Sequence, residues 1–376
     1  MKLPARTLSL LPWIVCAIGA GLALLRAPSP PEPRFAPPVT AKPPAVRDSF
    51  VNLLPAVGES AHSVSLADLG DGRIAAAWFA GSHEGAADVS IVLSTLDGQR
   101  WSPPTVLADR AGVQRDTGRR VRKLGNPVLW HDARGTLHCI FVSVGLGGWA
   151  GSSLNHVAST DGGAHWGRIE RLVTSPFLNL STLAHAPPLP LADGGSALPV
   201  YHEFIAKRPE WLRLDASGHV VDKTRFPGRL RLLQPAAAAL DDTHAIALMR
   251  DASGANRIHA ATTEDGGAHW SAPAVTKLPN PGAGIALLRL ADGRLLLAYN
   301  PVAGNRNQLA LAASRDQGRH WSPPMMLEQD NNPDAEFSYP ALLQDSRGII
   351  HLAYTWQRKR IKTLHFTPAW LETEAP

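Results

Sequence analysis

The sequence is poor in cysteine, in long Lys/Arg runs and in helical periodicity. Only Cys16 and Cys139 are present, so no disulfide can form within the part of the chain after residue 16. The alternation in TLHCIFVSV predicts Cys139 as a buried strand residue rather than a reactive thiol. The absence of a long basic run, zinc-finger spacing and an aromatic nucleotide-binding signature argues against nucleic acid as a partner.

Composition sets the broad class. The chain has 376 residues, 44% hydrophobic and 18% charged, which excludes general disorder and leaves room for one large β domain or two average domains. The formal charge of +5 is compatible with an anionic substrate or envelope surface, or with a compositional bias toward arginine.

The first 27 residues differ from the rest. Lys2 and Arg6 precede the apolar run Leu8 to Leu25, and Arg26 closes it. This pattern predicts an uncleaved transmembrane anchor, with a cleaved signal peptide as the alternative. Either way we expect export: inner-membrane anchored facing the periplasm, or secreted or periplasmic after cleavage. Residues 28–47 are proline-rich and predict a semi-rigid linker, so residues 48–376 form the expected domain.

That domain repeats one unit six times. Each unit has an apolar strand, a tight turn similar to Asp-Gly and a second apolar strand, as in SLADLGDGRIAAAWF and ALLRLADGRLLLAYN. Asp-Gly between apolar runs is a strong hairpin signal. Six units of about 50 residues, with four short strands each, predict a six-bladed β-propeller. A β-sandwich is the runner-up, but it does not explain the fixed period. The segment RDSFVNLLPAV is expected to complete the last blade.

An octet follows most of these hairpins. It is intact as STDGGAHW, TEDGGAHW and SRDQGRHW, with Asp161, Asp265 and Asp316 at its third position. Its hydroxyl and carboxylate groups can bond the backbone of the same turn, its glycines allow positive φ, and its Trp can pack between sheets. The octet is therefore expected to be scaffold.

These octets resemble the Asp-box (BNR) repeats of the sialidase superfamily, and residues 48–370 resemble bacterial BNR-repeat, sialidase-like proteins. The resemblance implies a six-bladed propeller whose site clamps a substrate carboxylate with three arginines and attacks the sugar with a tyrosine that a glutamate activates. Arg250, Arg306 and Tyr339 match the second arginine, the third arginine and the nucleophile.

Other positions depart from that pattern. His62 stands in place of the first arginine, Gln234 in place of the activating glutamate, and Thr355 in place of a glutamate on the final strand. Asn126 lies where the second blade normally has an aspartate. A neutral amide at 234 cannot take the proton of the tyrosine, so standard sialidase chemistry is in doubt.

Substitute acids are available in three blades. His83, Glu84 and Asp88 lie in blade one, His202 and Glu203 in blade three, and Glu336 lies three residues before Tyr339. Glu84 and Glu203 are the leading acid/base candidates, and Glu336 is a candidate base for Tyr339 or an independent carboxylate. Each of these residues has a non-catalytic alternative, as an exposed loop charge or a structural ion pair. Neither His-Glu pair has the second histidine of a zinc motif, so no metal is predicted.

Trp149, in the glycine-rich GLGGWAGSS, is a candidate wall for a sugar ring or a packed loop residue. The sequence thus predicts an exported sialidase-like glycoside hydrolase acting on an acidic sugar, with carbohydrate as its partner and no cofactor. The alternatives are a glycan-binding propeller without catalysis and a propeller that serves only as an assembly scaffold.

Overall fold

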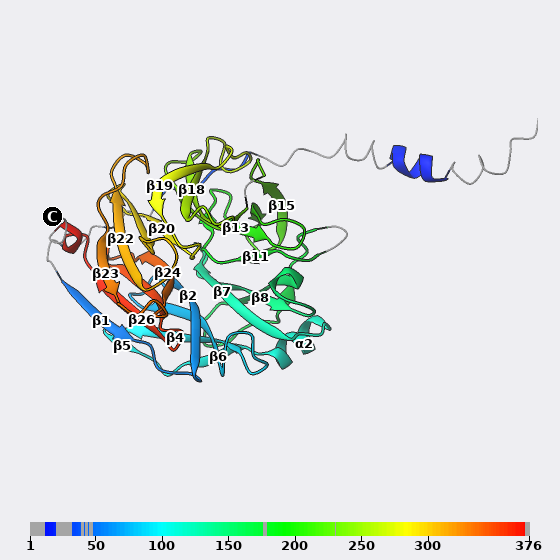
Figure 1. Ribbon diagram of the computed structural model, residues 1–376. Helices are drawn as coiled ribbons and strands as arrows, with labels where there is room; N and C mark the ends of the chain where they lie inside the picture. Colours follow the sequence, from blue (N-terminus) through cyan, green and yellow to red (C-terminus); the bar gives the residue numbers. More distant parts are fainter. Residues whose placement is uncertain are drawn as a thin grey trace, which may run out of the picture. The chain divides into compact units, whose positions relative to one another are not determined.

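The computed structural model describes residues 12–19, 32–38, 41, 44, 48–175, 179–229 and 231–372. The chain separates into two units, residues 1–32 and residues 33–376. Within the second unit, the described strands form six antiparallel sheets arranged as blades around an axis (Figure 1). The all-β six-bladed propeller is therefore confirmed.

The first three blades follow the chain, each from its inner to its outer strand. Blade 1 contains β2 (Ser60–Asp68), β3 (Ile74–Gly81), β4 (Ser90–Asp97) and β5 (Arg100–Trp101), with β6 (Thr105–Ala108) also on β4. Blade 2 contains β7 (Lys123–His131), β8 (Leu137–Val144), β9 (Ser152–Ser159) and β10 (Glu170–Arg171). Blade 3 contains β11 (Leu183–Ala184), β13 (Ser196–His202), β14 (Arg208–Leu214) and β15 (Val220–Arg225), with β12 (Leu189–Pro190) also on β13.

The last three blades complete the ring. Blade 4 contains β16 (Leu232–Ala239), β17 (Ala245–Asp251), β18 (Arg257–Thr263) and β19 (Ala274–Pro279). Blade 5 contains β20 (Ala286–Arg289), β21 (Leu295–Tyr299), β22 (Gln308–Ser314) and β23 (Met325–Gln329). Blade 6 contains β24 (Phe337–Gln344), β25 (Ile350–Trp356), β26 (Arg360–Phe366) and β1 (Ser49–Leu53). Outside the sheets lie a short α-helix, α2 (Arg110–Thr117), and the 3-10 turns η1 (Trp149–Gly151) and η2 (Trp370–Glu372).

Ring closure joins the two ends of the propeller. β1 pairs antiparallel with β26, from Ser49 opposite Phe366 to Leu53 opposite Lys362. The N-terminal strand therefore supplies the outer strand of the last blade, as the sequence predicts. The ring closes within residues 49–366, so all six blades lie inside the second unit.

The octets form turns between the third and fourth strands, as expected. At Ser159, the hydroxyl donates to Asp161 Oδ1 (2.8 Å) and accepts from the Gly163 N–H (2.9 Å). Asp161 Oδ1 also accepts from the His165 N–H at 2.9 Å. The same bonds recur in the other two intact copies, at Thr263 and at Ser314. The octet is a folding element, and its carboxylate is occupied by its own turn.

Antiparallel connectivity gives the propeller two different faces. The Asp-Gly hairpins and the octets lie at one end of the strands, which we call the turn face. The loops between second and third strands, and the connections between blades, lie at the other end, which we call the mouth face. Every candidate site residue therefore comes to the mouth face or to the inner strands beneath it.

Four inner strands carry a bulge near the mouth. The register shifts in β2, β7, β16 and β24, where Ser63, Asn126, Gln234 and Tyr339 have φ between 46° and 53°. Positive φ in non-glycine residues costs of order 1–3 kcal/mol each and persists only where the surroundings enforce it. A bulge also bends a strand and redirects its side chains, which brings these positions toward the axis.

The predicted N-terminal anchor or signal segment, residues 1–27, lies mostly outside the described residues. Residues 12–19 form a helix in the first unit. In the part of the chain that the structure describes, no helix has the length and apolar character needed to cross a membrane. The rest of the apolar run, residues 8–11 and 20–25, lies outside the described residues.

Candidate functional site on the mouth face

Tyr339 lies at the centre of the candidate site. Its ring, half-buried on the bulge of β24, packs against His62 of blade 1 at 4.4 Å between centroids and against His185 of blade 3 at 5.1 Å. The Arg306 guanidinium lies 5.7 Å from the ring centroid. Residues from four blades thus meet around one tyrosine.

Two arginines from neighbouring blades converge on one backbone oxygen. Arg250 Nη1 donates to the Gly282 carbonyl at 3.1 Å, and Arg306 Nη2 donates to the same oxygen at 3.5 Å. Arg250 comes from β17 and Arg306 from the loop after β21. The Nε of Arg250 is buried without a hydrogen-bond partner among the described residues. This arrangement places two positive charges side by side.

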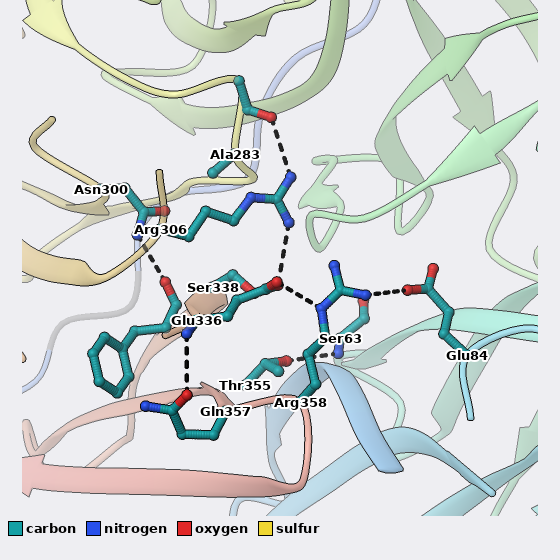
Figure 2. Close-up of polar contacts among 12 residues, drawn as sticks. Ser63, Glu84, Ala283, Asn300, Arg306, Glu336, Ser338, Thr355, Gln357 and Arg358 are labelled. Carbon is teal, nitrogen blue, oxygen red and sulfur yellow. Dashed lines mark hydrogen bonds and ion pairs between the residues drawn. The ribbon is translucent and has the colours of Figure 1, made fainter. Parts of the chain in front are cut away.

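An alternating chain of charges extends from Arg306 toward blade 1. Glu336 Oε1 accepts from Arg306 Nη1 at 3.2 Å, and Glu336 Oε2 accepts from Arg358 Nε at 2.6 Å. Arg358 Nη1 in turn donates to Glu84 Oε2 at 3.3 Å. Figure 2 shows this series, and no dashed line reaches the third guanidinium nitrogen of Arg358.

The environment of Glu336 keeps it ionised. Burial alone raises the pKa of this carboxyl, but hydrogen bonds from Ser338 and Arg358 and the charge of Arg306 together hold the pKa below its usual value. No hydrogen bond joins Glu336 to the Tyr339 hydroxyl among the described residues. As placed here, the carboxylate neutralises two arginines and does not contact the tyrosine proton.

Arg358 lies in a strained turn. Gln357 and Arg358, between β25 and β26, both have positive φ, at 54° and 56°. The turn is tied down because the Gln357 N–H donates to the Glu336 carbonyl at 2.7 Å and the Gln357 amide accepts from the Glu336 N–H at 3.2 Å. Two left-handed non-glycine residues in succession therefore hold a cation at the mouth.

A neutral polar network lies below the charges. The Tyr201 hydroxyl accepts from Gln234 Nε2 at 3.3 Å and from Asn126 Nδ2 at 3.4 Å. All three side chains are buried, and burial raises the pKa of Tyr201 well above its usual range. Among the described residues, Gln234 therefore forms no hydrogen bond with Tyr339. It donates to the hydroxyl of Tyr201 instead, which stays protonated.

The two histidines beside Tyr339 are neutral at physiological pH. Burial lowers the pKa of His62 to about 3 and that of His185 to about 3, against 6.5 in water. The Nδ1 atoms of both rings are buried and have no hydrogen-bond partner among the described residues. Replacing the expected arginine by His62 has therefore removed a charge from this position.

The remaining acid candidates differ in their surroundings. The Glu203 N–H donates to Ser181 Oγ at 2.8 Å, which fixes the backbone, and no bond to the Glu203 carboxylate is found in the described residues. Glu84 is paired with Arg358. Asp88 instead accepts from the Ser82 N–H and hydroxyl, both at 2.9 Å, and so closes its own loop.

Three aromatic candidates are also placed. His83 is exposed and its Nδ1 lies 3.2 Å from Ser82 Oγ. His202 Nε2 accepts from the Ile205 N–H at 3.2 Å and interacts with charges of the outer strands, so it does not join the cluster. Trp149 covers Gly125, and Lys123 Nζ lies 3.9 Å from its ring centroid, so the loop packs at the edge of the mouth.

Sequence reasoning missed Tyr201 and His185, and it did not assign Arg358 to the site. Tyr201 follows a strand pattern and His185 comes directly after the two-residue strand β11, so neither carries a signal of its own. The strain at Arg358 is visible only in the backbone. Among the described residues, no group of three or more His, Cys, Asp or Glu is arranged to hold a metal ion.

The chain matches the family of BNR repeat-like domains over residues 72–352, and it therefore belongs to that family. Together with the sialidase structures below, this makes it a sialidase-like BNR repeat protein. Comparison with curated proteins gives no match.

Several solved structures share the fold. The Hadza microbial sialidase Hz136 matches with a TM-score of 0.68 and 18% identity, over 82% of this chain and 66% of that one. The leech intramolecular trans-sialidase complexed with 2,7-anhydro-Neu5Ac matches with a TM-score of 0.69 and 14% identity, over 85% and 69%. The intramolecular trans-sialidase from Ruminococcus gnavus matches with a TM-score of 0.68 and 14% identity, over 86% and 98%. This chain thus spans just under two thirds of the length of Hz136, and identities this low establish the fold alone.

Proposed function

We propose that this protein is a glycoside hydrolase whose mouth-face site binds and cleaves a sugar that carries a carboxylate. The observation that carries the proposal is the convergence of Arg250 and Arg306 on one carbonyl beside the half-exposed Tyr339. Glu336 and Glu84 pair with Arg306 and Arg358, whereas Arg250 has no carboxylate partner among the described residues, so the cluster retains positive charge that an anion would neutralise. Bidentate carboxylate recognition is what guanidinium groups do best. The relatives named as sialidases act on a carboxylated sugar, which supports this class.

Arg358 extends the cationic lining. It is half-exposed, is held in position by Glu336 and Glu84, and has one nitrogen outside these ion pairs. In this proposal Arg250, Arg306 and Arg358 supply donors from three blades to an anion bound beside Tyr339. We assign Arg358 to substrate binding alongside the two arginines that the sequence identifies.

The chemistry follows from the groups at the centre. Negative charge that develops on the Tyr339 oxygen is stabilised by Arg306 and Arg358, both of which interact with that side chain. In this proposal the Tyr339 oxygen attacks or stabilises the anomeric carbon, and when it attacks, its proton passes to solvent water as the glycosidic bond breaks. Glu203 donates a proton to the leaving oxygen and then removes one from the water that displaces Tyr339, whose oxygen regains a proton from solvent. His62, His185 and Tyr201 form the neutral floor.

A binding protein without catalysis is the second candidate. It is favoured by one observation: Glu336 and Glu84 both lie in ion pairs, and the position of the expected base carries the amide of Gln234. Such a site retains anion recognition while lacking a group that takes the proton of Tyr339.

The test uses 4-methylumbelliferyl sialic acid as substrate. The wild-type protein is expected to release the fluorophore, while Tyr339→Phe and Glu203→Gln are expected to reduce kcat by at least about a hundredfold. Release that is unchanged in Tyr339→Phe would contradict the assigned role of the tyrosine. Binding of sialic acid by calorimetry without turnover would select the binding protein.

Export remains part of the proposal and rests on the N-terminal sequence alone. The basic residues before the apolar run of residues 8–25, and the prolines after it, support delivery of the propeller to the periplasm or outside the cell. Fractionation of cells that express the full chain tests it, and recovery in the cytoplasm alone would contradict it.

A further inference from the structure

Large hydrophobic side chains on the mouth face are exposed in one sector. Leu146 is 80% exposed, Val173 66%, Phe204 57% and Ile205 79%. They lie in the loop after β8, the connection from β10 to β11 and the loop after β13, all around blades 2 and 3. We call these four residues the apolar rim.

The other blades differ at the same positions. Their loops between second and third strands carry small and polar residues: 82–89 in blade 1, 252–256 in blade 4, 301–307 in blade 5 and 357–359 in blade 6. The remaining exposed large hydrophobics of the described propeller lie on the peripheral strands: Val51, Leu53, Val106, Val221, Val275 and Met326. Exposure of three or more apolar residues in neighbouring loops costs solubility and marks an interaction surface.

Backbone hydrogen bonds connect the loops of the rim, which are distant from one another in the sequence. The Arg122 N–H donates to the Val144 carbonyl at 2.7 Å beside the Leu146 loop. Ser181 donates to the Ser152 carbonyl at 2.7 Å, and its hydroxyl accepts from Glu203 next to Phe204. These bonds hold the loops that carry the apolar residues in one sector of the mouth face.

Basic residues border the same surface. Arg119, Arg120 and Arg122 are exposed on the connection from α2 to β7, and none of them forms an ion pair with a carboxylate in the described part of the chain. Arg119 lies close enough to Arg171 to lower its pKa through charge repulsion, after the larger effect of burial. On the other side, Lys207 follows Ile205 in the loop. Glu203 lies at the inner edge of this region, toward the site.

Apolar side chains bordered by arginine and lysine fit an anionic lipid surface. The hydrophobic groups enter the boundary between headgroups and acyl chains, while the cations remain among the negatively charged headgroups. A soluble glycan would not require Leu146 and Ile205 to project outward, and a protein partner would not require unpaired arginines along one border.

We propose that the apolar rim and its basic border dock the mouth face of blades 2 and 3 onto an anionic membrane, so that the site opens toward glycans attached to that surface. This goes beyond the proposed hydrolase activity, because docking requires neither Tyr339 nor turnover. Substrates on lipids or on surface polymers would reach the site without leaving the membrane.

Vesicle flotation of residues 33–376, which form a closed propeller on their own, tests the docking. Vesicles of phosphatidylglycerol and phosphatidylcholine in equal parts are compared with pure phosphatidylcholine. The wild-type protein is expected to float with the anionic vesicles, with a partition coefficient at least about tenfold higher than for the neutral ones. Phe204→Ser/Ile205→Ser is expected to lower the partition coefficient by at least about tenfold, and Arg119→Ala/Arg120→Ala/Arg122→Ala to remove the preference for anionic lipid.

The matched control is Val221→Ser/Val275→Ser, which removes two exposed hydrophobics from the peripheral strands β15 and β19. It is expected to float like the wild type, with circular dichroism confirming the fold of each variant. Failure of the wild type to float, or equal loss in the control, would overturn the proposal. So would unchanged flotation of Phe204→Ser/Ile205→Ser, whatever the activity on soluble substrate. Failure of hydrolysis has no bearing on flotation, so the two proposals fail separately.

Discussion

The two faces of this propeller differ in whether their contacts form within one turn or between blades. On the turn face, one octet is repeated, and each copy satisfies its own hydrogen bonds within eight residues, as at Ser159, Asp161 and His165. On the mouth face no two loops are alike, and Tyr339 meets side chains from other blades. The repeated turns stabilise the ring. Because the mouth-face loops do not have to repeat, they can form one asymmetric site at its centre.

The largest effect is expected from disturbing the turn face. Gly267→Ala places a methyl group 2.6 Å from Trp211 Nε1 at a φ of +91°. Backbone strain and overpacking together should lower the free energy of unfolding by about 3 kcal/mol. Urea unfolding measures this.

The matched control for that change is on the mouth face. Gly254 has a similar φ of +100° but open space around the added methyl group. Gly254→Ala should cost about 1 kcal/mol, from the backbone alone. Equal losses in the two variants would show that Gly267 is needed only for its backbone conformation, and not for packing between blades.

The next effect concerns the mouth face and separates binding from stability. Arg306→Ala should weaken glycan affinity by about a hundredfold, because charged hydrogen bonds to the carboxylate are lost. Arg319→Ala, an exposed arginine in the octet turn of the same blade, should leave affinity unchanged. Calorimetric titration with sialic acid distinguishes them, and equal weakening by the control would place anion binding outside the mouth.

A pH dependence should come from histidine pairs on the turn side. His156 Nε2 lies 2.9 Å from His138 Nδ1, and His365 Nδ1 lies 2.7 Å from His351 Nδ1. Burial, reinforced by the neighbouring histidine, lowers the pKa of His156 to about 4 and that of His365 to about 3. Since the folded state resists protonation, stability is fully present above about pH 6.5 and is lost as the pH falls toward these values.

The expected slope is about 1.4 kcal/mol per pH unit for each of the two histidines within that window. His156→Gln/His365→Gln should flatten the dependence of the unfolding free energy on pH, while His131→Gln should not. The slope that remains is expected from the other histidines whose pKa burial lowers, including His62 and His185 on the mouth side. An unchanged slope in the double variant would remove the turn-side pairs as its cause.

The smallest effect is expected at Asp88. Asp88→Asn retains acceptor capacity toward Ser82 and should change kcat/KM by less than about twofold. Glu203→Gln is the comparison, because its carboxylate is outside such a turn. If the two variants lose activity equally, Asp88 of blade 1 contributes to acid catalysis as much as Glu203 of blade 3 does, against the proposal.

Local patterns explain what sequence reasoning found. The hairpins, the octets and the closure by β1 depend on residues close in the chain or on a fixed repeat, so six blades were predictable. Arg250, Arg306 and Tyr339 were found through resemblance, and the structure brings them together around one space. The predicted base Glu336 is instead bound by Arg306 and Arg358, a pairing between loops that no spacing in the sequence indicates.

The architecture follows from local sequence, because strand alternation, Asp-Gly turns and octets satisfy their hydrogen bonds locally and repeat at one period. The site depends on contacts between blades. Ring closure brought His62, His185 and Arg306 against Tyr339, and the strained turn at Gln357 and Arg358 placed a further cation beside them. These contacts depend on the angle between blades, which closing the ring fixes and no short segment encodes.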